Sequence, residues 1–508
     1  MRAEPGLLDV ELNQVSRRAG WGDRRSHVPI PLQLASALIA AIRSGRLAPG
    51  AALPGSRPLA QQLGLHRNTV VAAFDELREQ GWLETSRASH TRVTRTLPAE
   101  TQATRVTRRE DAPGFPLRPF HNSSRAFEAV GRDVLDFTGG LPDARLFPSQ
   151  LLARAYRRAL KLSSGRALAF GSPAGSLKLR EQLARALAAR RGVNAHVDEL
   201  LITRGSQLAL HLLSIALLRP GDVVAVESPG YPSAREAFTL LGAKLLPIAV
   251  DGEGLDVGAL ERALAKTAIR ALYVTPHCHD PTTVTLSARR RLRLLELARR
   301  HRFAVLEADY DHEFQFEGAA VAPMASADPG GVVILVGTLS KAVAPGLRMG
   351  FVSAPRQLLS TLLAIRGQVD RQGDLGLENA VAELMEDGEV QRHALRARRV
   401  FHERRDVLAH ALRTQLPDTL EFEVPRGGLA LWARVDASVD VERWAEFARS
   451  EHGVRFFTGR QYMPNGRPSP FVRIGFGHLD ARELVEAVKR MKAALGSSER
   501  RLRGVRRP

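Results

Sequence analysis

Cysteine is almost absent from this sequence of 508 residues, in which Cys278 is the only one. A disulfide framework is therefore excluded, and we expect a reducing, cytoplasmic environment. Long apolar runs are missing too: no stretch of about 18 consecutive apolar residues occurs, which excludes a transmembrane helix and a membrane partner. The first residues include Glu4, Asp9 and Glu11 and no apolar segment, so we expect no secretory signal.

Lysine is scarce: of the 73 basic side chains, seven are lysine and the rest are arginine. The formal net charge of +19 predicts an anionic partner, with nucleic acid as the first candidate. Acidic side chains are missing altogether from residues 24–74, a window that holds six arginines. This local imbalance is stronger support for a nucleic-acid partner than the total charge, because arginine-rich coding raises the total everywhere.

The length allows two to four domains of about 150 residues each. Hydrophobic residues make up 44% of the chain and charged residues 25%, which is typical of globular proteins and excludes a mostly disordered chain.

Apolar spacing inside the acid-free window predicts three short helices. The first carries Leu34, Leu38 and Ile42 on one face. The second begins after Ser56 as N-cap and ends at Gly64, and the third ends at Gly81.

The last two helices, joined by a short turn that contains glycine, form a helix-turn-helix pattern. Its second helix places Arg67, Asn68 and Thr69 at the N-terminal end, where side chains can reach base edges. Residues 82–84 and 91–93 can then form a two-stranded wing. A small helical bundle with solvated arginines is the alternative that the pattern alone leaves open.

The string LPGSRPLAQQLGLHRNTVVAAFDELREQGWL closely resembles the GntR-type winged helix-turn-helix domain, here over residues 28–95. The resemblance implies that Arg57, Arg67 and Thr69 contact double-stranded operator DNA. His66 replaces the usual serine cap, at a cost of about 1 kcal/mol, and the wing tip at 87–92 lacks the usual glycines.

The remaining chain divides by composition. Residues 1–27 form an N-terminal extension, and residues 96–134, rich in Thr, Arg, Pro and Ser, form a linker long enough to separate two domains. Residues 135–495 form one large domain. Residues 496–508 form a basic tail, and the five arginines among the last ten residues predict disorder there.

Apolar strands alternate with helices in the large domain. The expected strands are 222–227, 245–250, 271–275, 304–307 and 332–336, and one expected helix is 288–301. This alternation predicts an α/β fold with a mostly parallel central sheet, whose ligand binds at the carboxyl ends of the strands.

Two motifs follow expected strands. Residues 203–207 (TRGSQ) open an amphipathic helix, and a helix that begins with small residues offers free N–H groups to a phosphate. Residues 336–341 (VGTLSK) end a strand on two hydroxyls and Lys341, and Arg348 follows. A lysine beside an arginine and hydroxyl donors can form a Schiff base while Arg348 holds a phosphate. A plain helix cap and a surface lysine are the alternatives.

These strings resemble the fold-type I pyridoxal 5′-phosphate (PLP) domain of the aminotransferase class over residues 135–495. The match includes GSPAG at 171–175, ESPGY at 227–231 and VRIGF at 472–476. The resemblance implies that Lys341 forms the Schiff base with PLP and that Tyr231 stacks on the ring. It also implies a phosphate shell, made of Ser206, Gln207, Thr338, Ser340 and Arg348. Arg473 would pair with the carboxylate of an amino-acid-like ligand.

A GntR-type domain followed by an aminotransferase-like domain resembles the MocR family of bacterial transcriptional regulators. The resemblance implies a head-to-tail homodimer and an effector that is PLP or a small amino compound.

Two departures from that pattern bear on chemistry. The family string Glu-Asp-Asp-Tyr-Asp reads EADYD at 307–311, so Ala308 replaces the acid that protonates the pyridine nitrogen, which makes the ring a poor electron sink. Asp309 substitutes only if the strand end shifts by one residue; Tyr310, the donor to the ring oxygen, is intact.

The second departure is the loop 277–283, HCHDPTT, in which Thr283 stands at a position suited to glycine. Its His-Cys-His-Asp run is rich in metal-ligand types, but neighbouring positions in a short loop rarely converge on one ion, so we expect no metal.

Three functions remain from this reading. The first is a DNA-binding regulator that senses PLP or an amino compound, the second a regulator that has lost the cofactor, and the third an active aminotransferase with an added DNA-binding domain. Ala308 argues against the enzyme, and Lys341 with its expected phosphate shell argues against loss of PLP.

Overall fold

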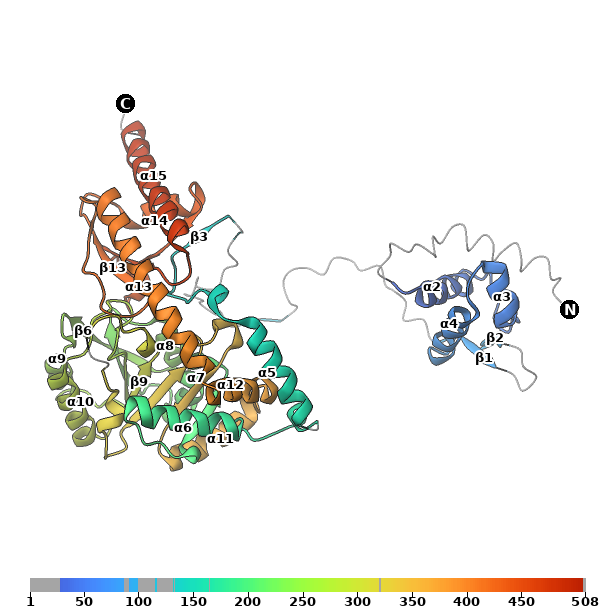
Figure 1. The fold of residues 1–508 in the computed structure, drawn as a ribbon, viewed down its shortest axis with the longest axis horizontal. Coiled ribbons are helices and arrows are strands. Elements are labelled where there is room, and N and C mark those ends of the chain that lie inside the picture. The colour runs from blue at the N-terminus through green and yellow to red at the C-terminus, as the bar shows by residue number, and fades with distance from the viewer. Residues whose placement is uncertain are drawn as a thin grey trace. The chain divides into compact units, whose positions relative to one another are not determined.

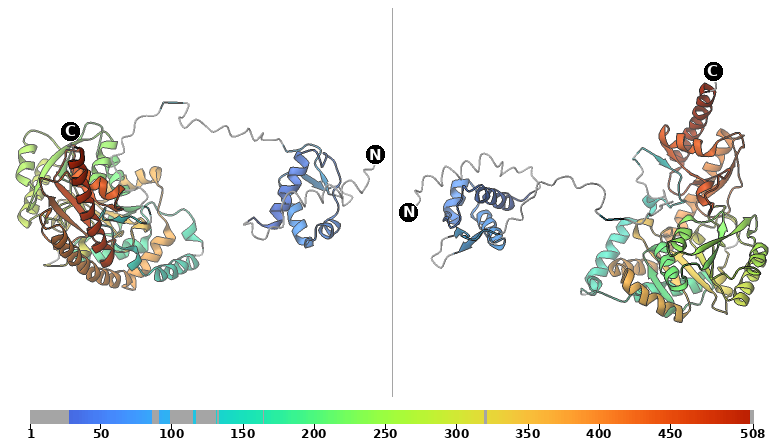
Figure 2. Two further views of the ribbon diagram at one scale, coloured as in Figure 1. Left: turned by 90° about the horizontal axis from the view of Figure 1, so that it is seen from above. Right: turned by 180° about the vertical axis from the view of Figure 1, so that it is seen from behind.

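A computed structural model describes residues 28–85, 91–98, 115–116, 131, 133–163, 165–318 and 321–505, with side chains up to residue 496. The chain divides into two compact units, Met1–Phe120 and His121–Pro508, and each is described by itself (Figures 1 and 2). Among the described helices, none combines the length and the apolar character that a membrane crossing requires. The predicted extension, most of the predicted linker and the wing tip at 86–90 lie outside the described residues.

The N-terminal unit is a winged helix-turn-helix, as predicted (Figure 1). Its elements are α2 (Ile30–Arg43), α3 (Ser56–Leu63), α4 (Arg67–Glu79), β1 (Leu83–Thr85) and β2 (Thr91–Val93). The two strands pair antiparallel. Leu38, Leu59 and Val70 are completely buried and join the three helices in one core.

The helix ends follow the sequence signals with one exception. Gly64 (φ +65°) and Gly81 (φ +77°) adopt the left-handed conformation that stops α3 and α4. Ser56 is not the N-cap of α3, as predicted, but its first residue, and Gly55 caps the helix without a side-chain bond. His66 does cap α4, because its Nδ1 accepts from the Asn68 N–H at 3.3 Å, so the imidazole takes over part of the missing serine's role.

The large unit contains an eight-stranded sheet, in the order β4-β11-β10-β9-β8-β5-β6-β7. Its strands are β4 (Leu200–Thr203), β5 (Val223–Ser228), β6 (Lys244–Asp251), β7 (Gly254–Leu255), β8 (Ala271–Val274), β9 (Ala304–Asp309), β10 (Val333–Thr338) and β11 (Gly350–Ser353). The five consecutive strands β10, β9, β8, β5 and β6 run parallel, which confirms the mostly parallel sheet. The carboxyl ends of these strands therefore meet at one edge.

Helices cover both faces of this sheet. One face packs on α7 (Gly205–Leu217), α8 (Pro232–Leu240) and α11 (Arg356–Val369). The other packs on α5 (Ser149–Leu162), α6 (Leu177–Arg191), α9 (Val257–Leu264), α10 (Ala288–His301) and α12 (Leu375–Glu386). Along β9, Leu306 and Ala308 join the α7 face, whereas Val305 joins the opposite face, as expected for alternating strand residues.

A smaller antiparallel sheet and three helices form the upper part of the large unit in Figure 1. The sheet contains β12 (Leu420–Glu421), β13 (Ala430–Val435), β16 (Phe471–Gly475) and β15 (Phe457–Thr458). It packs with α13 (Glu389–Gln415), α14 (Val441–Ser450) and α15 (Ala481–Val505) around the fully buried Trp444. A short parallel pair, β3 (Leu135–Asp136) and β14 (Val454–Arg455), joins the start of the unit to this subdomain.

The C-terminal segment differs from the prediction. Instead of a disordered tail from residue 496, α15 continues to Val505, and its last turns project beyond the subdomain (Figure 2). The reason is visible in the composition, since residues 481–505 contain no proline and many strong helix formers such as Ala, Leu, Glu and Arg.

Candidate cofactor site and DNA-binding surface

Lys341 lies just beyond the carboxyl end of β10, where the parallel strands meet. Its Nζ is 2.5 Å from Asp311 Oδ1 and 4.3 Å from the centre of the Tyr310 ring. The lysine side chain is 11% exposed and the aspartate 2%, so this ion pair is almost closed to solvent. Burial raises the pKa of Asp311, and the lysine charge opposes that rise.

The N-terminus of α7 lies beside Arg348. Gly205 begins α7 with φ +78°, and no side chain caps the helix. The guanidinium passes so close that a Cβ at Gly205 would lie 3.0 Å from Arg348 Nη2. Arg348 also donates to the Arg204 carbonyl at 3.3 Å. Free N–H groups, a positive dipole end and an arginine together suit a phosphate.

The other predicted phosphate residues surround this point. Ser206 is the second residue of α7, and Gln207 donates from Nε2 to the Ser233 carbonyl at 3.1 Å, which ties α7 to the start of α8. Thr338 Oγ1 donates to the Met349 carbonyl and accepts from the Ser340 N–H at 3.1 Å. These residues lie at the sheet edge with Lys341, and their roles stay predictions.

Tyr231 precedes α8 and packs against the core on the α7 face of the sheet. Burial raises the pKa of its hydroxyl, although a hydrogen bond with the Ser233 side chain lowers it. The buried Arg235 holds this segment by donating to the carbonyls of Gly230, Gln461 and Tyr462. The large sheet and the smaller subdomain are thereby joined next to the tyrosine.

The residues at the end of β9, which were predicted to contact the PLP ring, lie on different faces of the sheet. Ala308 is buried on the α7 face, where the resemblance expects a carboxylate. Asp309 pairs instead with Arg191 of α6, on the opposite face, at 2.6 Å. The Tyr310 hydroxyl donates to the Cys278 carbonyl at 2.5 Å. The strand therefore does not shift by one residue, and nothing in these contacts brings Asp309 to the α7 face.

The side chains of the loop 277–283 have different surroundings. Both ring nitrogens of His277 lack a hydrogen-bond partner among the described residues, and burial lowers its pKa to about 4. His279 Nδ1 contacts Thr282 Oγ1 at 2.7 Å, and burial raises the pKa of the Cys278 thiol. Thr283 does adopt the left-handed conformation, at φ +65°. Within the described part of the chain, no group of three or more His, Cys, Asp or Glu could hold a metal ion.

Arg473, on β16, contacts a carboxylate of the protein. Its Nη2 lies 3.2 Å from Asp280 Oδ2, and the two side chains are 4% and 11% exposed. Burial disfavours the charge of Arg473, yet Asp280 and neighbouring tyrosines raise its pKa above the ordinary value. Gly140 leaves room for the guanidinium, since a Cβ there would lie 3.0 Å from Nη2.

Sequence reasoning missed three residues that shape this site: Asp280, Asp311 and Arg235. Asp311 follows Tyr310 directly, and Asp280 ends the unusual HCHD run, so both stood inside quoted strings. Their partners come from distant segments, which no local pattern reveals.

In the N-terminal unit, Arg57 and Arg67 are exposed near the first residues of α3 and α4. Asn68 is exposed and Thr69 is half-buried beside them. Neither arginine side chain forms a hydrogen bond or ion pair with another described residue, so both guanidinium groups are available for an anionic partner.

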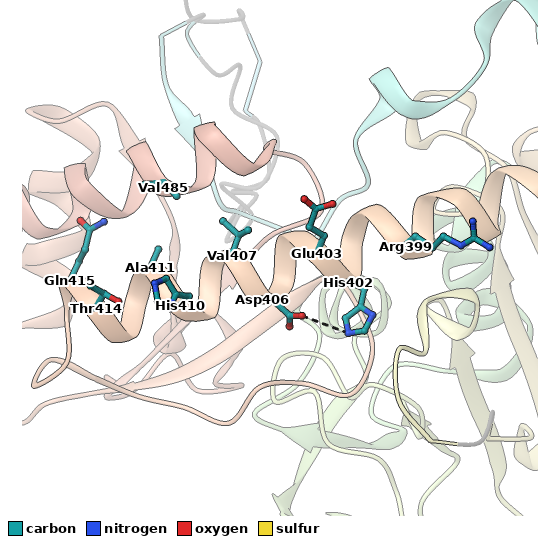
Figure 3. Close-up of a pocket in the computed structure, with 10 residues that line it drawn as sticks. All are labelled: Arg399, His402, Glu403, Asp406, Val407, His410, Ala411, Thr414, Gln415 and Val485. Carbon is teal, nitrogen blue, oxygen red and sulfur yellow. Dashed lines mark ion pairs between the residues drawn. The ribbon is translucent and has the colours of Figure 1, made fainter.

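A separate hollow of about 780 Å³ runs along the outer side of α13 (Figure 3). It is lined by Arg399, His402, Glu403, Asp406, Val407, His410, Ala411, Thr414, Gln415 and Val485. His402 and Asp406 pair there at 3.8 Å, and no residue of the Lys341 site lines it.

Two family models match this chain. Residues 32–93 match the bacterial regulatory proteins of the gntR family, and residues 132–491 match aminotransferase class I and II. Among curated relatives, the probable rhizopine catabolism regulatory protein MocR of Rhizobium meliloti is 30% identical and covers 93% of this chain and 95% of its own length. The HTH-type transcriptional regulator TauR of Rhodobacter capsulatus is 31% identical and covers 89% and 94%.

The large unit also matches solved structures. LysN, the alpha-aminoadipate aminotransferase of Thermus thermophilus, complexed with N-(5′-phosphopyridoxyl)-L-leucine, superposes with a TM-score of 0.68 at 30% identity. The match covers 73% of this chain and 94% of LysN. Fold and comparisons together define a transcriptional regulator with a GntR-type DNA-binding unit and an aminotransferase-like unit of fold type I. The chain belongs to the MocR family of transcriptional regulators.

Proposed function

We propose that the aminotransferase-like unit binds PLP, alone or with a small amino compound, and that this binding controls how the GntR-type unit engages operator DNA. The observation that carries the proposal is the group formed by Lys341, the uncapped start of α7 and Arg348, at the carboxyl edge of the parallel sheet. Because operator DNA is the proposed partner, we expect the protein to act in the cytoplasm.

The residues present fit a phosphate-bearing aldehyde. Gly205 keeps the α7 N-terminus open to Arg348, where any larger residue would meet the guanidinium, and Ser206 and Gln207 follow in the first turn. Among the site residues assigned above, Lys341 alone has a side-chain amine that could react with the aldehyde. When bound, PLP supplies an aldehyde that forms Schiff bases with amines and a ring that withdraws electrons.

The protein's own residues would then divide the work. Arg348 and the α7 amides hold the phosphate, Tyr231 packs over the ring, and Asp311 fixes the position of Lys341 Nζ. Support for PLP comes also from the LysN complex, whose bound phosphopyridoxyl group lies in a unit of the same fold. In the proposed dimer, a head-to-tail pair of chains would present two winged helices to a two-part operator.

Catalytic transamination is the less favoured function, because Ala308 provides no carboxylate on the α7 face. A regulator without cofactor is also less favoured, because Lys341, Arg348 and the open α7 start at Gly205 are the groups that binding of PLP would require.

Absorbance spectroscopy of the purified full chain, with and without added PLP, tests the proposal. We expect a visible band from PLP bound to the protein, and borohydride reduction should fix a pyridoxyl group on the peptide that contains Lys341. Lys341→Ala should lose both signals, while the matched control Lys266→Ala, an exposed lysine of the same unit, should keep them. If the purified protein shows no visible band and borohydride does not label Lys341, PLP binding is contradicted.

A further inference from the structure

The arginine expected to meet an effector carboxylate is already paired within this protein. Arg473 Nη2 lies 3.2 Å from Asp280 Oδ2, and both residues are more than nine-tenths buried. They come from different parts of the large unit, since Asp280 follows β8 of the large sheet and Arg473 lies on β16 of the smaller one. The pair therefore joins the two sheets, and the arginine that the resemblance assigns to a ligand carboxylate is occupied by a carboxylate of the chain.

Asp280 also acts electrostatically on residues of the Lys341 site. Burial is the largest cause that raises the pKa of Tyr231, Tyr310 and Asp311, and the charge of Asp280 raises each of these pKa values further. Its Oδ1 atom is buried and has no hydrogen-bond partner among the described residues. A buried carboxylate oxygen without a donor is costly, and a ligand that brings a donor would remove that cost.

The described cations of the candidate site can neutralise a phosphate, but they leave no unpaired positive charge for a second anion. Among the site cations of the described chain, Lys341 is paired with Asp311 and Arg473 with Asp280. Arg348 remains, and it lies at the α7 N-terminus where the phosphate is expected. A carboxylate of an incoming amino acid would thus stand beside Asp280 without a free cation, and like charges repel.

We propose that the effector is a primary amine that lacks a carboxylate and carries a second donor, a hydroxyl or an ammonium group, which donates to Asp280. This inference rests on the proposed function, because the amine is captured beside Lys341 in the PLP-loaded protein. It assigns Asp280 as the residue that rejects amino acids and Arg473 as the partner that holds Asp280 in place.

Pairs of compounds that differ only by a carboxylate test the proposal directly. Putrescine against L-ornithine, and ethanolamine against L-serine, would be titrated into the PLP-loaded full chain, with binding measured by calorimetry and by the shift of the PLP band. We expect each amine to bind at least tenfold more tightly than its parent amino acid.

Variants locate the cause. Asp280→Asn should free Arg473 and improve the binding of both amino acids at least tenfold, and adding Arg473→Gln should abolish that gain. Asp251→Asn, which changes a carboxylate paired with Arg290 at the protein surface, should alter nothing.

The proposal is overturned if either amino acid binds the wild type within tenfold of its amine, or if a folded Asp280→Asn protein gains less than tenfold for both. The wild-type comparison stands even if the variant fails to fold. Loss of the PLP band in the wild type would instead contradict the proposed function, so the two failures are distinguishable.

Discussion

The character of the candidate site depends on single side chains at the end of β9. Ala308 and Asp309 are neighbours, yet one lies on the α7 face and the other pairs with Arg191 of α6 on the opposite face. A carboxylate one position further along the strand therefore does not replace the missing one. The consequence is a candidate site with a lysine and a predicted phosphate cradle but without the acid that would make a bound PLP ring a strong electron sink.

The substitution Ala308→Asp should restore that acid. We expect conversion of an amino compound to its carbonyl product, measured by product formation in the presence of PLP, to rise at least about tenfold, or about 1.4 kcal/mol of barrier. Adding Lys341→Ala should remove the gained activity. An unchanged rate in a folded Ala308→Asp protein would show that position 308 does not lie at the pyridine nitrogen.

At the scale of elements, the starts of helices present several candidate functional groups of both units. The start of α4 exposes Arg67 and Asn68, and the start of α7 leaves its amides open to Arg348. Glycines shape several of these ends, with Gly64 closing α3 before the turn and Gly205 opening α7. The placement follows from helix chemistry, because unpaired N–H groups and the positive dipole end attract anions, whether DNA phosphates or a cofactor phosphate.

Arg67→Ala tests the DNA-binding role of α4. If Arg67 contacts a base, affinity for the operator should fall by about 1–3 kcal/mol and sequence preference should relax, as measured by titration with operator and scrambled duplexes. The matched control is Arg78→Ala at the other end of α4, where the arginine already pairs with Asp75 at 2.5 Å. An equal loss on both duplexes would make Arg67 a phosphate contact, and no loss at all would remove it from the interface.

The sequence predicted five of the eight strands of the large sheet to within about two residues, namely β5, β6, β8, β9 and β10, and it predicted the helix Ala288–His301 without error; β4, β7 and β11 were missed. Continuous apolar runs mark buried parallel strands, and the intervening helices have clear periodicity. The smaller sheet was not predicted. Its strands β12 and β15 contain only two residues each, too few for any period, and the pairing of its longer strands β13 and β16 joins segments that are distant in the sequence. Sequence strings made Lys341, Arg348 and Arg473 candidate site residues, and those roles stay predictions. The pairing of Arg473 with Asp280 was not predicted, because packing alone joins those segments.

At the scale of the whole molecule, the large unit exposes apolar side chains near its start. Leu162, Leu168 and Phe170 are 72%, 80% and 78% exposed, and Leu177 is 55% exposed. Four exposed large apolar side chains within residues 162–177 favour a protein interface at this segment. It supports the proposed homodimer, in which a second chain would cover these residues.

The variant Leu168→Asp with Phe170→Asp tests this surface. Light scattering after gel filtration should show the wild type as a dimer and the double variant as a monomer, because two buried carboxylates without partners would destabilise the interface. Leu240→Asp serves as control, since Leu240 is 56% exposed at the end of α8. A variant that keeps the wild-type mass would place the dimer contact elsewhere.

The small side chain of Ala308 has one more consequence for the proposed sensor. A site that captures an amine beside Lys341 but converts it poorly returns that molecule unchanged when its concentration falls. The transcriptional response would then follow the current concentration of the amine and would end when that concentration falls. The regulator would not deplete the amine that it binds. An enzyme-like fold without this carboxylate would therefore report the concentration of the amine without consuming it.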